Sequence, residues 1–224
     1  MFTVDFRFEE NQTTIEFPCN EEFLSAKFDE LGVEDKLKTS QYMIGTNYAA
    51  LKRLVTDFAD VDELNFLAKC LDSFDKNELN NLWFERIQDI TATENLYAAN
   101  NVLRAVERAE KNNELDKLEA VINFADRYDS ASIIKLEDNI DNFRYFDNVY
   151  DKEGLGRALI DENDDYYIDE DIEEFFMFEQ YAESVMDECD CKFCDNGAVL
   201  LEGLTLAEIL GEDNKSEEMT MGGM

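Results

Sequence analysis

Histidine is absent from the sequence. It is the side chain that most often acts as a general acid or base at neutral pH, and it is a common metal ligand. Its absence excludes hydrolase triads that use histidine and zinc sites that contain it. With 54 acidic residues in the chain, the presence of a carboxylate pair says nothing about catalysis. We therefore expect a protein that is not an enzyme.

Basic residues are scarce. The chain has 20 Lys and Arg against 54 Asp and Glu, a formal net charge of −34. The imbalance is largest near the C-terminus, where residues 151–224 contain 23 acidic and four basic side chains. Affinity for nucleic acid comes largely from Lys and Arg that neutralise phosphates. The composition therefore argues against direct binding to nucleic acid.

The same charge suits the opposite role, a protein that imitates nucleic acid. Duplex DNA carries one charge per about 1.7 Å of its axis, so a charge of this size matches roughly 58 Å of duplex, or about 17 base pairs. The alternative is that the acids only keep the protein in solution, as net charge does in many proteins. Composition leaves both interpretations open.

Long apolar runs and an export signal are also missing. No run approaches the 18 or so residues of a membrane span, and the start, MFTVDFRFEE, has neither a basic nor an apolar signal region. The cysteines are odd in number, as expected for a reducing compartment: Cys19, Cys70, Cys189, Cys191 and Cys194. We expect a cytoplasmic protein that does not enter a membrane.

Two sequence patterns that suggest a ligand fail on spacing. Gly-Leu-Gly at 154–156 lacks the third glycine and the preceding strand of a dinucleotide-binding loop, and no Walker A motif is present. A calcium loop that starts at Asp161 has Tyr166 where glycine is needed and Ile172 where a bidentate glutamate is needed. We expect no cofactor and no calcium site.

The cysteines near the C-terminus leave one metal question open. Cys189, Cys191 and Cys194 have C-x-C-x-x-C spacing on a predicted strand. Zinc needs four ligands, so Cys19 or Cys70 would have to complete the site. We expect these thiols to be small packing groups rather than metal ligands.

The first residues predict a β-hairpin followed by a helix. Apolar residues alternate with polar ones from Phe2 to Phe8, and a second run extends over 13–17, closed by the only proline, Pro18. Asn20 is a typical N-cap for a helix over 21–31, and Gly32 ends it. A short strand or extended link is expected over 42–48.

From residue 47 to 128 the apolar period becomes helical, which predicts a bundle of four or five short helices with Trp83 in the core. Their apolar stripes lie within 51–58, 61–71, 79–87, 96–106 and 115–125. Asp60, Asp75 and Thr93 stand where N-caps are expected.

The rest of the chain predicts a small acidic α+β unit. Helices are expected at 130–139, 151–160, about 169–176, 178–188 and 204–210, and strands at 143–146, 189–194 and 198–202, the last two joined by a tight turn at Asn196 and Gly197. The predicted class is α+β, elongated and multi-domain. Its predicted parts are an N-terminal hairpin and helix unit at 1–45, a helical bundle at 46–128, an acidic α+β domain at 129–211 and a disordered tail at 212–224.

The stretch 151–194 combines dense carboxylates with aromatic residues at helical spacing. Phe175, Phe176, Phe178, Tyr181 and Val185 are expected to form its apolar side, with the acids facing water. The carboxylates that we expect to contact a partner are Asp161, Glu162, Asp164, Asp165, Asp169, Glu170, Asp171, Glu173, Glu174, Glu179, Glu183, Asp187 and Glu188. We expect them to act collectively, without one dominant residue.

Three parts of the sequence resemble the ArdA antirestriction proteins of conjugative plasmids, transposons and phages. VDELNFLAKCLDSF at 61–74 is similar to the family's siedLNeLA helix, and GLGRALIDE at 154–162 is similar to its eeLGryl segment. FMFEQYAESVMDE at 176–188, followed by DNGAVLLE at 195–202, is similar to the family's yIDYEAYGRD and Gyvei ending. The resemblance covers roughly residues 45–203.

Within the last segment, Phe178, Glu179, Tyr181 and Ala182 stand at the family's Tyr, Glu, Tyr and Gly positions. The family's Gly-Arg-Asp is replaced by residues 182–184, Ala-Glu-Ser. The resemblance implies an elongated, three-domain homodimer whose surface carboxylates stand in for DNA phosphates. It implies that the dimer occupies the DNA-binding groove of type I restriction–modification enzymes.

Two alternatives stay open on the sequence. The target could be another host-defence nuclease, such as a CRISPR effector, because charge does not reveal which DNA-binding enzyme is met. The chain could also be an acidic, non-enzymatic interaction protein with a different partner. All three hypotheses expect no direct contact with nucleic acid and no membrane.

Overall fold

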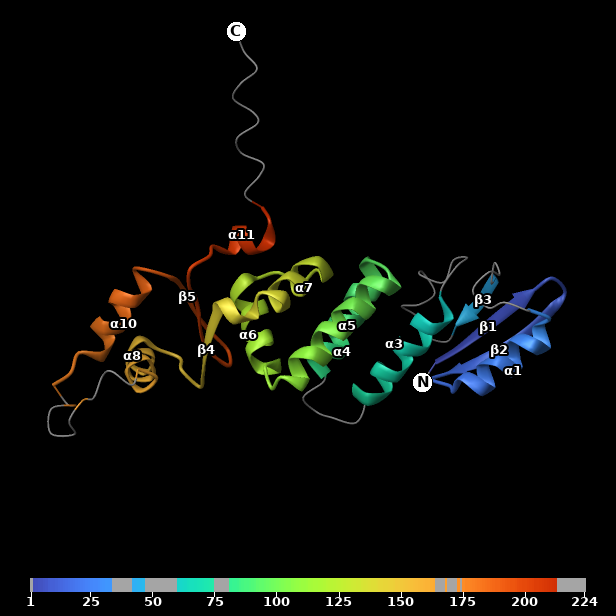
Figure 1. Cartoon of the computed structure of the whole chain (residues 1–224), viewed down its shortest axis with the longest axis horizontal. Helices are drawn as coiled ribbons and strands as arrows, with labels where there is room; N and C mark the ends of the chain where they lie inside the picture. Colours follow the sequence, from blue (N-terminus) through green and yellow to red (C-terminus); the bar gives the residue numbers. More distant parts are fainter. Residues whose placement is uncertain are drawn as a thin grey trace, which may run out of the picture. The chain divides into compact units, whose positions relative to one another are not determined.

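The computed structural model describes residues 2–33, 42–46, 60–74, 81–163, 168, 173 and 175–212. It is mixed α+β, as predicted (Figure 1), whereas the elongated, multi-domain arrangement stays a prediction. The chain divides into two compact units, Met1–Val106 and Glu107–Met224. The three domain boundaries expected from the sequence stay predictions. None of the helices in the described residues is both long enough and apolar enough to span a bilayer.

The first unit opens with the predicted hairpin. β1 (Phe2–Phe8) pairs antiparallel with β2 (Asn11–Phe17) and, on its other side, with β3 (Tyr42–Thr46), so the strand order is β2-β1-β3. Alternation along the strands buries one face, where the Phe6 ring lies 5.6 Å from the Phe28 ring in an edge-on contact. This core orients the helix that follows.

That helix, α1 (Glu21–Leu31), confirms both predicted end signals. The Asn20 side chain accepts a hydrogen bond from the Phe23 N–H at 2.7 Å. Gly32 has φ +80°, a left-handed conformation that glycine adopts without steric cost, and its N–H donates to the Asp29 carbonyl. Local sequence therefore fixes where α1 begins and ends.

Three helices of the predicted bundle follow: α3 (Val61–Phe74), α4 (Asn81–Thr93) and α5 (Leu96–Lys111). Trp83 is buried, as expected. Asp60 caps α3 by accepting from the Asp62 N–H at 2.9 Å. The stripe at 51–58 and the cap expected at Asp75 lie outside the described residues.

The cap predicted at Thr93 is wrong. Thr93 is the last residue of α4, and its hydroxyl donates back to the Asp89 carbonyl at 2.8 Å. α5 is capped instead by Asn95, whose side-chain oxygen accepts from the Ala98 N–H at 3.0 Å. A threonine hydroxyl competes for the carbonyl four residues back, which leaves the capping position to the asparagine that follows.

The second unit is built around a three-stranded antiparallel sheet with the order β4-β6-β5. Its strands are β4 (Phe143–Asp147), β5 (Asp190–Cys194) and β6 (Gly197–Leu201). The helices described in this unit include α6 (Leu115–Ala125), α7 (Ser130–Asp138), α8 (Lys152–Asp161), α10 (Phe178–Met186) and α11 (Leu206–Leu210). The central strand, β6, is buried over its whole length because it has neighbours on both edges and on both faces.

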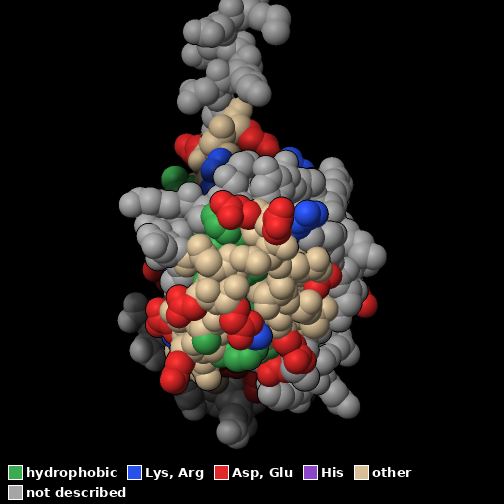
Figure 2. All heavy atoms as spheres, turned by 90° about the vertical axis from the view of Figure 1, so that its right-hand side faces the viewer, with side chains coloured by type: hydrophobic (Ala, Val, Ile, Leu, Met, Phe, Trp, Pro, Cys, Tyr) green, Lys and Arg blue, Asp and Glu red, His purple; other side chains and the backbone are tan. Residues whose placement is uncertain are grey.

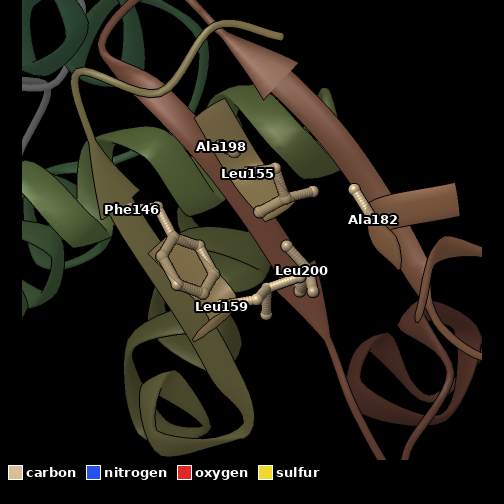
Figure 3. Close-up of a cluster of buried hydrophobic side chains, with 6 residues drawn as sticks. All are labelled: Phe146, Leu155, Leu159, Ala182, Ala198 and Leu200. Carbon is tan, nitrogen blue, oxygen red and sulfur yellow. The ribbon is translucent and has the colours of Figure 1, made fainter. Parts of the chain in front are cut away.

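The two faces of this sheet are covered by different helices. On one face, Phe146, Ala198 and Leu200 form a buried cluster with Leu155 and Leu159 of α8 and Ala182 of α10 (Figure 3). On the other face, the Phe143 ring meets the Phe124 ring of α6 at 5.8 Å. Alternation along the strands sends successive side chains to opposite faces. The sheet is thus a rigid base for α8 and α10.

Candidate partner-binding surface on two acidic helices

α8 and α10 pack against each other at very short range. A Cβ added at Gly156 of α8 would lie 2.1 Å from the carbonyl oxygen of Phe178, which opens α10. Only glycine allows this approach. Asp151 caps α8 by accepting from the Gly154 N–H at 2.7 Å. The Gly-Leu-Gly sequence at 154–156 therefore serves the packing of two helices.

The structure describes part of the predicted acidic surface. The described carboxylates are Asp161, Glu162, Glu173, Glu179, Glu183, Asp187 and Glu188, of which Glu173 is half-buried and the others are exposed. Those outside the described residues are Asp164, Asp165, Asp169, Glu170, Asp171 and Glu174. The prediction that the acids face water is confirmed for the exposed group.

Three of these carboxylates form one row along α10. Glu179, Glu183 and Asp187 are spaced by four residues, which places them on one face with a rise of about 6 Å between neighbours. Lys152 of α8 interacts with all three. Its hydrogen bond to Glu183 and the charges of Glu179 and Asp187 raise the pKa of its ammonium group. The row is a fixed line of negative charge.

Ion pairs hold other carboxylates of this surface in place. The Arg144 guanidinium on β4 donates to Glu162 at 2.7 Å and to Glu202 at 2.8 Å. The separate N–H groups of its planar guanidinium allow it to bridge two carboxylates. Exposed pairs of this kind add little to stability, because water screens them and the side chains lose freedom. Their main effect here is to fix the direction in which the carboxylates point.

Two further cations act in the same way. Arg157 of α8 donates to Glu153 at 3.1 Å and also pairs with Glu173, and its guanidinium lies 4.1 Å from the centre of the Phe178 ring. Lys152 donates to Glu183 at 2.6 Å. These partners were missed from the sequence. Only Glu153 and Arg157, four residues apart on one helix, gave a signal that could have found them.

The apolar side expected for this stretch is partly wrong. Phe178 is buried and Tyr181 and Val185 are half-buried, as predicted, but Phe175 is 73% exposed and Phe176 is 36% exposed. Residues 175–177 form a turn and an irregular link before α10, so the helix expected at about 169–176 does not extend over its last two residues. Apolar residues at helical spacing share one face only where the backbone is helical, so the spacing does not place these two rings in the core.

The cysteine cluster does not converge on one point. Cys191 belongs to the face of β5 that packs on α8 and α10, whereas the Cys194 thiol lies 3.6 Å from the Ala120 carbonyl of α6. Burial, and then the neighbouring Cys189 and Cys194, raise the pKa of Cys191 to about 11. In the part of the chain that the structure describes, no group of three or more potential metal-ligating side chains comes together.

Acidic side chains are not confined to the second unit. Over the face of the first unit seen in Figure 2, formed by β1, β2 and α1, Asp and Glu side chains outnumber those of Lys and Arg. This agrees with the overall excess of 54 acidic over 20 basic residues. Each unit therefore presents negative charge on its own surface.

Neither a scan against protein-family models nor a search of curated proteins returns a match to this sequence. The resemblance to the ArdA proteins rests on the sequence segments given above. In the structure, 61–74 is α3, 154–162 covers most of α8, and 176–188 and 195–202 contain α10 and β6. Two of the three parts of the resemblance thus form the acidic surface and its base.

Proposed function

We propose that the protein is an antirestriction protein that acts as a DNA mimic and occupies the DNA-binding groove of type I restriction–modification enzymes. In this proposal it is a non-enzymatic, cytoplasmic homodimer that blocks a host defence by binding. The observation that carries the proposal is the row of Glu179, Glu183 and Asp187 on a helix held rigidly against a buried sheet.

The rigidity of the row matters because a DNA groove recognises a fixed array of charge. Phosphates on one DNA strand follow each other at about 3.4 Å along the axis. Carboxylates on one helix face rise by about 6 Å per step, so a second row is needed to approach that density. Asp161 and Glu162 at the end of α8 and Glu188 after α10 are further exposed carboxylates of these two helices.

The basic side chains of the second unit lie next to carboxylates, and this pairing leaves the net negative charge unchanged. Among the described residues of the second unit, Arg108, Arg127, Arg144, Lys152 and Arg157 each pair with at least one carboxylate. Their charges are therefore cancelled within the protein. Binding to a basic groove should be steered by the remaining long-range field and weakened by salt.

Displacement of DNA tests the proposal directly. A purified type I methyltransferase and a CRISPR nuclease are each loaded with labelled duplex DNA, and the protein is titrated in at low and at moderate salt. We expect stoichiometric, salt-sensitive release of DNA from the methyltransferase. Release from the nuclease alone would assign the protein to the other defence enzyme, and no release from either would contradict DNA mimicry.

Charge-neutralising variants locate the contact. Glu179→Gln, Glu183→Gln and Asp187→Asn combined should weaken binding to the methyltransferase about tenfold or more and make its salt dependence shallower, since fewer charges meet the groove. The matched control removes three exposed acids of the first unit, with Glu10→Gln, Glu16→Gln and Glu22→Gln. Equal losses from both triple variants would mean that net charge matters and that the row on α10 does not.

A further inference from the structure

An exposed apolar patch lies at the start of α10, within the acidic surface. Phe175 is 73% exposed and Met177 is 63% exposed, while Phe176 turns inward enough for its ring to lie 4.7 Å from that of Phe178. Phe176 and Met177 line an open cavity of about 310 Å³. Single exposed apolar residues are ordinary, but neighbouring large ones beside a cavity mark interaction sites.

Phe175 and Met177 do not belong to the packing that holds α10 in place. The buried cluster under α10 uses Ala182 and its neighbours, and Phe178 fills the contact with α8. Met177 stands at the N-cap of α10 and, like Glu114 at the start of α6, makes no side-chain capping bond, whereas Asn20, Asp129, Asp151 and Thr205 cap their helices. Methionine is a poor N-cap. Such a departure from the local rule is typical of a functional position.

The rim of the patch indicates what kind of partner covers it. Glu153, Glu173 and Glu179 line the same cavity as Phe176 and Met177, and Arg157 there is already paired with Glu153 and Glu173. A second copy of this chain would bring the same acids against each other. A partner with an apolar side chain flanked by Lys or Arg would pack on the patch and pair with the carboxylates around it.

We propose that Phe175 and Met177 form an apolar anchor that packs against an apolar side chain on the basic, DNA-binding face of the partner enzyme. This inference rests on the proposed function and adds to it. Charge alone gives an affinity that salt removes, as it does for DNA itself. An apolar anchor adds a component that salt does not screen, and it lets the mimic outcompete DNA, which has no such side chains.

The test uses a substitution for which binding by charge alone and binding with an apolar anchor predict opposite changes in affinity. Met177→Asp adds a negative charge and places a carboxylate at the start of a helix, where the helix dipole favours it. If binding depends on charge alone, Met177→Asp binds the methyltransferase at least as tightly as the wild type. The anchor predicts affinity about tenfold weaker, as for the loss of a central apolar contact.

Phe175→Ser should give the same loss, and Leu204→Ser is the matched control, because Leu204 is a 40% exposed apolar residue outside the patch. Circular dichroism confirms that each variant is folded. Wild-type affinity in both patch variants overturns the anchor alone, whereas failure of the wild type to bind overturns the proposed function and the anchor with it. A patch variant that changes the oligomeric state but not the affinity makes the patch an interface between copies, which also overturns the anchor.

Discussion

The side-chain amide of Asn65 makes two hydrogen bonds with the backbone of Cys19. The Cys19 N–H donates to Asn65 Oδ1 at 2.9 Å, and Asn65 Nδ2 donates to the Cys19 carbonyl at 2.9 Å. Cys19 follows the hairpin, and Asn65 is a buried residue of α3, so this pair joins the N-terminal sheet to α3.

Asn65→Asp should destabilise the first unit. The substitution keeps the shape and the acceptor but replaces the donor with an oxygen that faces the Cys19 carbonyl, and a buried, unmatched polar pair costs about 1 to 3 kcal/mol. Urea unfolding measures the loss as a lower midpoint. The control, Asn101→Asp, adds the same charge at an exposed site and keeps the acceptor for Arg104. Equal midpoints for the two variants would show that the clamp contributes nothing.

Gly156→Ala should reverse the usual effect of this substitution in a helix. Alanine normally stabilises a helix over glycine by about 1 kcal/mol. Here its Cβ would lie 2.1 Å from the Phe178 carbonyl oxygen, so α8 and α10 have to move apart, and we expect a net loss of about 1 to 3 kcal/mol. Thermal unfolding measures it. In the control, Gly154→Ala, the nearest atom is the Asp151 side-chain oxygen at 3.2 Å, which needs to yield by only a few tenths of an ångström, so a much smaller change is expected.

Asp129 gives the second unit a defined response to acid. Burial opposes its ionisation, but hydrogen bonds from Ser132 and the charge of Arg127 outweigh burial and lower the pKa of Asp129. A lowered pKa in the folded state means that the stabilisation is present above the ordinary aspartate pKa near 4 and is lost as the pH falls through the lower, folded value. Asp129→Ala should cost about 1 kcal/mol at neutral pH, since it removes the cap of α7.

The difference in unfolding free energy between Asp129→Ala and the wild type should therefore shrink in acid. Denaturant unfolding at a series of pH values measures it. Asp129→Asn is the control, because asparagine caps a helix as well as aspartate does but does not titrate. If the difference in unfolding free energy between the wild type and Asp129→Ala stays constant down to the lowest pH, the lowered pKa of Asp129 is contradicted.

Lys152→Gln should tighten binding to the methyltransferase several-fold. Lys152 donates to Glu183 at 2.6 Å and neutralises part of the row on α10. Its removal exposes the full charge of the row, so the salt dependence of binding should become steeper. Lys111→Gln removes the same charge from an exposed site on α5 and should have a smaller effect. Weaker binding by Lys152→Gln would mean that Lys152 itself contacts the partner.

Much of the local structure could be predicted, because its signals lie within a few residues. The period of two at Phe2–Phe8, the cap at Asn20 and the stop at Gly32 depend on neighbouring backbone groups and were confirmed. The Thr93 cap failed on a local competition that the sequence does not resolve: a hydroxyl can bond forward to an N–H or back to a carbonyl.

The sequence by itself determined the charge, the class and the places of most helices and strands, since charge is a count and periodicity is a local property. The tertiary structure decided which cations hold the carboxylates and which aromatic residues stay exposed. Arg144 and Glu202 are distant in sequence and meet only through the sheet. Phe175 looked like a core residue because apolar spacing says nothing about where a helix begins, and packing around Phe178 leaves it in water.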